Sequence, residues 1–206
     1  MIELFVSAFA TFFVVIDPPG CAPIFAGLTA GANAAHRRAM AIRAVGVAAL
    51  ILTVFALFGE KLLHGLGIEL ASFRIAGGVM LFLIALEMVF EKRTQRREDR
   101  AARVTAEESE DVSIFPMAMP MIAGPGSIAS VMLLMARNDG VQRSLVVLGA
   151  MWLNLLLTLA ALLAAGSLMR VLGPKIEAVI TRLLGVLLAA LAVQFVLDGV
   201  QAQFLR

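Results

Sequence analysis

Six long apolar stretches, separated by short polar connections, set the pattern of this 206-residue chain. They run over about residues 2–28, 39–58, 71–90, 112–135, 144–168 and 179–200. Each is close to the roughly 20 residues that a helix needs to cross a bilayer. A polar segment over residues 91–111, rich in both basic and acidic side chains, interrupts the pattern. The pattern predicts an all-α membrane protein with six transmembrane helices.

The composition supports this interpretation. The chain is 61% hydrophobic and 16% charged, with a mean hydropathy of +0.94. A soluble domain has a smaller apolar fraction and a larger charged fraction. A net charge of only +2 argues against nucleic acid as a partner. Cys21 is the single cysteine, so an intramolecular disulfide is excluded. The first apolar stretch lacks a basic start and a clear cleavage site, and we interpret it as the first membrane segment.

Two Pro-Gly breaks lie inside apolar stretches, at Asp17-Pro18-Pro19-Gly20 and at Gly124-Pro125-Gly126. Proline removes a backbone donor, and glycine loosens the helix. Within a membrane, the freed N–H and C=O groups must face protein, water or a solute. The sequence therefore predicts that the first and fourth transmembrane helices are interrupted.

The two halves of the chain resemble each other. Pro19-Gly20 aligns with Pro125-Gly126 at an offset of 106, and similar offsets relate three further landmark pairs. These pairs are Thr53 with Thr158, Arg74 with Arg182, and Gly77 with Gly185. Three spans in each half would give the halves opposite orientations in the membrane. We therefore expect two inverted three-helix repeats, residues 1–90 and 112–206, joined by a cytoplasmic polar loop over residues 91–111, an organisation typical of transporters.

Basic residues favour one orientation of the chain. The loops after the first, third and fifth spans, with the adjoining span ends, hold Arg37, Arg38, Arg43, Lys92, Arg93, Arg96, Arg97, Arg100, Arg103, Arg170, Lys175 and Arg182. The other side holds only Lys61, Arg74, Arg137, Arg143 and Arg206. The positive-inside rule then predicts that the 91–111 loop is cytoplasmic and that both termini are periplasmic.

The breaks supply the candidate binding residues. A half-helix that begins at the second break would present free N–H groups and a positive dipole end to an anion. The predicted substrate-binding residues are Asp17, Pro19, Gly20, Cys21, Gly124, Pro125, Gly126, Ser127 and Asn154. Asp17 is also the candidate for ion coupling, because a carboxylate inside a membrane segment is costly. Capping of the following half-helix explains Asp17 equally well, and the two roles are compatible.

Other polar residues have simpler interpretations. Glu87 lies near the end of the third span, where it would reach the interface or pair with Arg93. Asn154, Thr53 and Thr158 lie within spans, where hydrogen bonding between helices is the commoner use. No phosphate loop, metal-binding cluster or Ser-His-Asp grouping is present in the sequence, which predicts no enzyme activity, no cofactor and no metal site.

Long stretches of the chain are similar to the MarC family of inner-membrane proteins, within the wider LysE-like transporter group. The resemblance rests on IDPPGCAPIF (16–25), FGEKLLHGLGIELASFRIAGGVMLFLIALEM (58–88), FPMAMPMIAGPGSI (115–128) and LLGVLLAALAVQFVLDGV (183–200). Family members often carry a polar residue such as Asn after the first break, where this chain has Cys21. The resemblance implies six transmembrane helices and, as for some members, transport of small neutral amino acids.

Together these features predict a secondary transporter of a small zwitterionic solute, working by alternating access in the bacterial inner membrane. A neutral amino acid is the expected solute, sodium or a proton the expected coupling ion, and a homo-oligomer is compatible with the sequence. Two alternatives remain: a transporter of another small solute or of a cation, and a non-transporting membrane scaffold. A polar, water-reachable cavity where the two Pro-Gly breaks converge would favour transport, whereas breaks that lie apart or face lipid would exclude it.

Overall fold

The computed structural model describes residues 1–92, 95–96, 98–99, 111–138 and 140–204, with the backbone alone over 168–175 and at 177. Within these residues the chain is helical and contains no strand. The elements are α1 (Ile2–Ile16), α2 (Pro18–Leu28), α3 (Ala34–Gly65), α4 (Leu70–Val89), η1 (Ser113–Ile122), α6 (Pro125–Arg137), α7 (Val141–Leu163) and α8 (Ala165–Phe204). The all-helical class predicted from the sequence is confirmed.

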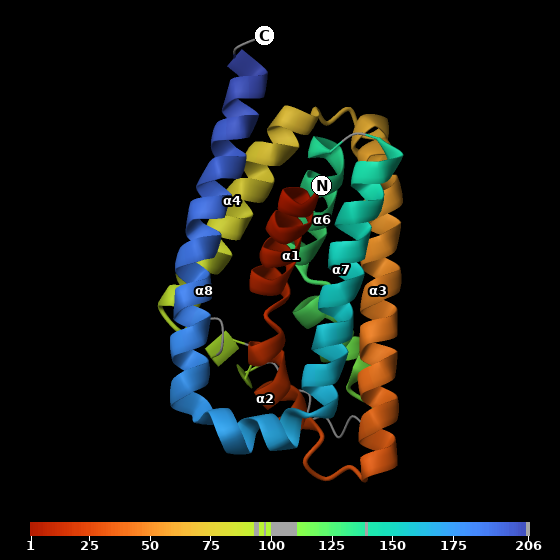
Figure 1. Ribbon diagram of the computed structural model, residues 1–206, viewed down its shortest axis with the longest axis vertical. Helices are drawn as coiled ribbons and strands as arrows, with labels where there is room; N and C mark the ends of the chain where they lie inside the picture. Colours follow the sequence, from red (N-terminus) through yellow and green to blue (C-terminus); the bar gives the residue numbers. More distant parts are fainter. Residues whose placement is uncertain (93–94, 97, 100–110, 139, 205–206) are drawn as a thin grey trace.

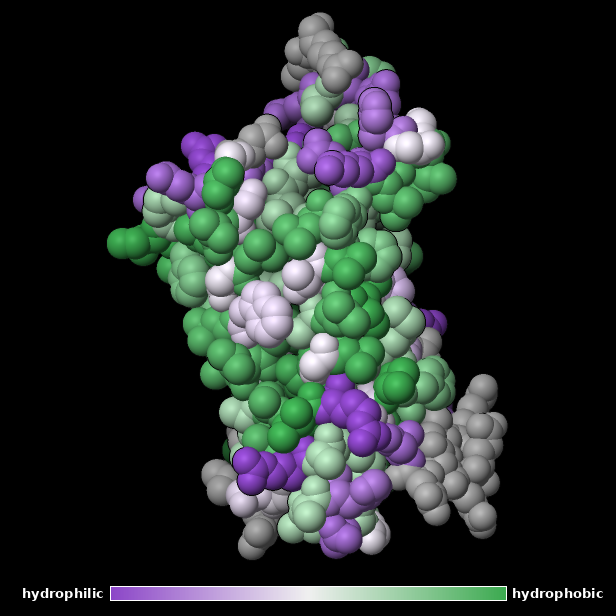
Figure 2. Space-filling view, turned by 90° about the vertical axis from the view of Figure 1, so that its right-hand side faces the viewer, coloured by the Kyte–Doolittle hydropathy of each residue, from purple (hydrophilic) through white to green (hydrophobic). Residues whose placement is uncertain are grey.

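Five helices or helix pairs of the described chain are long and apolar enough to cross a membrane. They cover Ile2–Leu28, Ala34–Gly65, Leu70–Val89, Val141–Leu163 and Ala178–Phe204. A sixth crossing results if η1 and α6, which meet at a bend of 51°, are counted together. Figure 1 shows the chain passing back and forth between the two ends of the bundle, with both termini toward the same end. Figure 2 shows an apolar belt between two polar ends.

The expected span boundaries need two corrections. The second span is longer than residues 39–58, because α3 continues from Ala34 to Gly65. The fifth ends at Leu163 rather than at residue 168, and α8 begins at Ala165. The first part of α8 lies across one end of the bundle before the chain turns along its length (Figure 1). Apolar residues continue through this turn, so hydropathy alone gave no boundary there.

α1 and α6 form the centre of the bundle, between the α3–α7 pair and the α4–α8 pair (Figure 1). Large side chains of α1 such as Phe12 and Ile16 are fully buried, and so is Leu133 of α6. α6 rests against small residues of its neighbours. A Cβ added to Gly59 of α3 would meet Met132 at 2.7 Å, and one added to Gly77 of α4 would meet Leu133 at 2.9 Å.

α4 and α8 pack antiparallel at very close range. A Cβ on Gly78 would lie 2.8 Å from the carbonyl oxygen of Ala192, and one on Gly199 would lie 2.9 Å from that of Ala71. A Cβ on Gly185 would lie 3.1 Å from the carbonyl oxygen of Ala85. The small residues recur every seven positions on both helices, at Ala71, Gly78 and Ala85 of α4 and at Gly185, Ala192 and Gly199 of α8. Such spacing keeps one face of each helix against the other, and small side chains let membrane helices approach closely.

We expect Gly78→Ala to destabilise the protein, because its Cβ would press on the backbone of α8. Overpacking of this kind costs about 1–3 kcal/mol, which should appear as a lower thermal unfolding midpoint in detergent. Gly149→Ala on α7 is the matched control, since a Cβ there meets nothing within 4 Å. That variant should be neutral or slightly more stable. Equal midpoints for the two variants would contradict the close packing of α4 and α8.

Candidate functional site

Asp17 forms the first interruption. α1 ends at Ile16 and α2 begins at Pro18, with Asp17 between them in a left-handed conformation at φ 60° and ψ 65°. Its Oδ1 accepts a hydrogen bond from the Gly20 amide at 3.1 Å, and the residue is 1% exposed. A carboxylate in this position stabilises the start of a helix by satisfying a free amide and complementing the dipole. The capping role considered for Asp17 is therefore present in the structure.

Two further residues complete the first interruption. Gly20 is required because a Cβ there would lie 2.2 Å from Oδ2 of Asp17. The Cys21 thiol donates to the carbonyl oxygen of Ile16 at 3.5 Å, as a sulfur donor does at longer range. The thiol thus contacts one of the carbonyls at the end of α1. The polar groups of this interruption are largely satisfied within the protein.

The second interruption is built differently. η1 ends at Ile122, and α6 begins at Pro125 after Gly124, which has no side chain to cap the helix. Ser127 repeats the role of Cys21, because its hydroxyl donates to the carbonyl oxygen of Ile122 at 2.7 Å. The first intrahelical bond of α6 runs from the Ile128 amide to Gly124. The amides of Gly126 and Ser127 precede it and have no carbonyl within the helix to bond.

A cavity of about 120 Å³ lies against this helix start. Its volume is on the order of ten times what one water molecule needs, so it can hold several waters or one small solute. It is lined by Val15, Ile84, Glu87, Arg96, Pro120, Met121, Gly124, Pro125, Gly126 and Ser127. The lining comes from the ends of α1 and η1, the start of α6, the last turns of α4 and the residues after it. The cavity therefore faces the end of the bundle at which α4 ends and η1 begins.

Glu87 and Arg96 supply the charges of the cavity. They form an ion pair in which the side chain of Glu87 is 24% exposed and that of Arg96 is 65% exposed. Glu87 thus stands inside the cavity wall, whereas Arg96 covers it from the solvent side. The positive end of the α6 dipole and the carboxylate of Glu87 border the same space. Such a site can hold a molecule that carries both charges.

The predicted site residues divide into two groups. Gly124, Pro125, Gly126 and Ser127 line the cavity. Asp17, Pro19, Gly20, Cys21 and Asn154 do not belong to its lining. Asn154 is fully buried in α7, and its Nδ2 donates to the carbonyl oxygens of Phe9 at 3.1 Å and Ala150 at 3.0 Å. It joins α7 to α1, which is the common use of an amide between membrane helices.

Glu87 is the residue that sequence reasoning undervalued. It was expected at the membrane interface or paired with Arg93, and Arg93 lies outside the described residues. Among the residues that the structure describes, its ion pair is with Arg96. The signal was present in the sequence, because Glu87 is an acid beside an apolar span, as Asp17 is. Within the described residues, no three His, Cys, Asp or Glu side chains come together in a way that could hold a metal ion.

Comparison with known proteins places this architecture in one family. The model of the MarC family of integral membrane proteins matches residues 2–204. A UPF0056 membrane protein of Methanocaldococcus jannaschii is 36% identical over 99% of both chains. The UPF0056 membrane protein YvbG of Bacillus subtilis is 33% identical over 99% of this chain and 97% of its own length.

A relative from Escherichia coli is named as an inner membrane protein. The UPF0056 inner membrane protein YhgN is 33% identical over 95% of both chains. No solved structure matches the chain with significance. The match over nearly the whole length and the apolar helices of the bundle lead to one conclusion: the chain belongs to the MarC family of integral membrane proteins.

Proposed function

We propose that the chain is a multi-pass secondary transporter of a small zwitterionic solute, with neutral amino acids as the solute class, and not an enzyme. The observation that carries the proposal is the cavity between the uncapped start of α6 and Glu87. A cavity at a broken helix is where transporters of this general design bind their solutes. Amides without a partner beside a cavity are costly within a membrane. That cost is not expected in a scaffold protein that binds no solute there.

The two charged ends of an amino acid match the two sides of the cavity. Its carboxylate would accept from the amides of Gly126 and Ser127, where the helix dipole favours negative charge. Its ammonium group would pair with Glu87 and displace Arg96. Because the side chain of Arg96 is 65% exposed, its guanidinium can return to water at little cost. A metal cation fits less well, since one acid already paired with an arginine is a poor ligand set.

Two sets of contacts support an inverted repeat of residues 1–90 and 112–206 around the 91–111 loop. The bond from Cys21 to Ile16 has its counterpart in the bond from Ser127 to Ile122, at an offset of 106. In the α4–α8 pair, Gly78 meets Ala192 and Val196, whereas Gly185 meets Ala85 and Val89, at an offset of 107. These contacts align Gly185 with Gly78 rather than with Gly77. Alternating access would then exchange the roles of the two halves.

Orientation and energy source complete the proposal. The name of the inner membrane protein YhgN supports a bacterial inner-membrane location. The distribution of basic residues favours both termini in the periplasm, so the cavity would face the cytoplasm. Transport would be driven by a gradient of the solute, sodium or protons. Several copies of the chain could associate through the apolar belt without involving the cavity.

Filling the cavity should abolish binding. We expect Gly126→Leu to lose uptake of labelled alanine in proteoliposomes, because even a Cβ at this position would lie 2.6 Å from Ile84. Gly149→Leu is the control, placed where a Cβ meets nothing within 4 Å. Size-exclusion chromatography verifies that both variants remain folded. Unchanged alanine affinity in a folded Gly126→Leu variant would count against a site at this helix start.

Removing the charge of Glu87 should weaken binding of zwitterions selectively. We expect Glu87→Gln to lower alanine affinity about tenfold, which corresponds to roughly 1.4 kcal/mol for a lost charged contact. Propionate and ethylamine, which each carry one of the two charges, should compete poorly with alanine in wild-type protein. Glu60→Gln, an acid outside this cavity, is the control. Equal competition by propionate would show that Glu87 does not recognise an ammonium group.

Asp17→Asn separates capping from coupling. Asparagine caps helices as well as aspartate does, so we expect near-normal stability and gradient-driven flux. Asp17→Ala should lose about 1–2 kcal/mol of stability through the missing cap. Both quantities are measured by thermal unfolding in detergent and by flux in proteoliposomes under sodium and proton gradients. Loss of gradient-driven flux in a stable Asp17→Asn variant would instead assign the coupling role to this carboxylate.

A further inference from the structure

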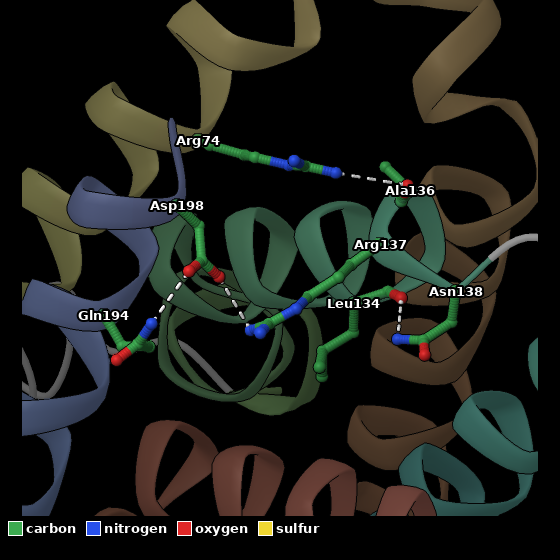
Figure 3. A network of polar contacts seen from close by, with 7 residues as sticks. All are labelled: Arg74, Leu134, Ala136, Arg137, Asn138, Gln194 and Asp198. Atoms are coloured by element: carbon green, nitrogen blue, oxygen red, sulfur yellow. Dashed lines mark hydrogen bonds and ion pairs between the residues drawn. The ribbon is translucent and has the colours of Figure 1, made fainter. Parts of the chain in front are cut away.

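A second cluster of charges surrounds the far end of α6 (Figure 3). Arg137, in the last turn of α6, lies 2.9 Å from Oδ2 of Asp198 in α8. The Nε2 of Gln194 donates to Oδ1 of the same carboxylate at 2.7 Å. Arg74 of α4 reaches over this pair to the carbonyl oxygen of Ala136, at a long 3.5 Å. Three helices are therefore joined at one carboxylate and one helix end.

This cluster lies at the end of the bundle opposite the cavity mouth. α6 starts beside the cavity and ends in the cluster, so the same helix borders both. The cavity faces the end at which α4 ends and η1 begins, whereas Arg74 lies in the second turn of α4 and Asp198 near the end of α8. In the observed conformation, polar contacts thus connect α6 to α8 and α4 at the end of the bundle opposite the one that the cavity faces.

The ion pair of Asp198 is not a fully formed hydrogen bond. Its Oδ2 is buried and has no hydrogen-bond partner, although a guanidinium nitrogen of Arg137 is 2.9 Å away. The side chain of Asp198 is 18% exposed, and that of Arg137 is 47% exposed. A carboxylate with an unused acceptor can take another donor at low cost. Arg74 is a candidate donor from the neighbouring helix, because α4 and α8 are in contact at Arg74: a Cβ on Gly199, next to Asp198, would lie 3.1 Å from the Cβ of Arg74.

The opposite end of the α4–α8 pair shows the ion pair that would form if Asp198 exchanged Arg137 for Arg74. There Arg182 of α8 forms an ion pair with Glu91, just beyond α4. Glu91 and Asp198 are 107 positions apart, the offset of the glycine contacts in this pair, and Arg74 and Arg182 are 108 apart. The counterpart of the Arg182–Glu91 pair is therefore an Arg74–Asp198 pair. The structure has Asp198 bound to Arg137 instead.

We propose that Asp198 is the carboxylate of a gate at the end of the bundle where both termini lie. The gate is closed when Asp198 pairs with Arg137 and open when it pairs with Arg74. This proposal rests on the transport function proposed above. Release of Arg137 would free the end of α6 from α8, and the Arg74–Asp198 pair would hold the open arrangement. The two arginines then act on one carboxylate in opposite directions.

Accessibility of the cavity tests the gate without using any solute. The reporter is Ile84→Cys, which lines the cavity, in a Cys21→Ser background that removes the only native thiol. A membrane-impermeant maleimide is added in vesicles to the side that carries the chain termini, identified by a C-terminal epitope tag. The labelling rate of the reporter measures how often the gate is open.

Because Asp198→Asn removes both ion pairs at once, we expect its labelling rate to stay close to that of the parent protein. We expect Arg137→Gln to raise the labelling rate about threefold to fivefold, the factor expected from loss of a partly exposed ion pair. Arg74→Gln should lower the rate by a similar factor. Arg137→Lys keeps the charge and should label like the parent protein. Arg143→Gln, an exposed arginine at the same end outside the cluster, is the control and should have no effect.

Two results would overturn the gate. In one, Arg137→Gln labels no faster than Arg143→Gln, although chromatography shows folded protein. In the other, Arg74→Gln raises the rate as much as Arg137→Gln, which would make the cluster a static brace without an exchange of partners. If the protein does not take up alanine, but Arg137→Gln and Arg74→Gln still change the labelling rate in opposite directions, the proposed solute is refuted and the gate is not.

Discussion

The need to satisfy backbone groups within an apolar bundle governs this structure. A helix interrupted inside a membrane leaves amides and carbonyls that lipid cannot bind. At the first interruption the protein supplies the partners itself, through Asp17 and the thiol of Cys21. At the second, Ser127 binds one carbonyl, but Gly124 leaves the amides of α6 uncapped beside a cavity. Because of this difference, we propose the second interruption rather than the first as the place where a solute binds.

The surrounding helices position α6 and supply the other side of the cavity. α4 and α8 pack together through glycine and alanine contacts and form a frame, and α6 rests against α4 of this frame. α4 also carries Glu87 into the cavity, so the frame contributes the second charge of the candidate site. At its far end, α6 is tied to the same two helices by Arg137, Asp198 and Arg74. A single helix thus connects the cavity to the cluster at the opposite end.

Much of this architecture is predictable from the sequence, because membrane spans need long apolar stretches and Pro-Gly pairs interrupt helices. The side-chain roles were harder to predict. Asp17 and Glu87 both look like costly acids near a membrane, yet only packing decides that one caps a buried helix and the other lines a cavity. Asn154 was predicted at the site, but it lies outside the cavity lining, and its Nδ2 donates to the carbonyl oxygen of Phe9 in α1. The turn at residue 164 was not predicted, because the residues on both sides of it are apolar and hydropathy shows no boundary there.

The central claim is that the start of α6 binds the carboxylate of a small zwitterion. Amide chemical shifts of purified, nitrogen-15-labelled protein in detergent test it most directly during titration with alanine. The account predicts saturable shifts at Gly126 and Ser127, with the amide of Gly20 unmoved, because Asp17 already occupies it. Alanine binding that leaves the amides of Gly126 and Ser127 unchanged, or that shifts Gly20 instead, would contradict the account.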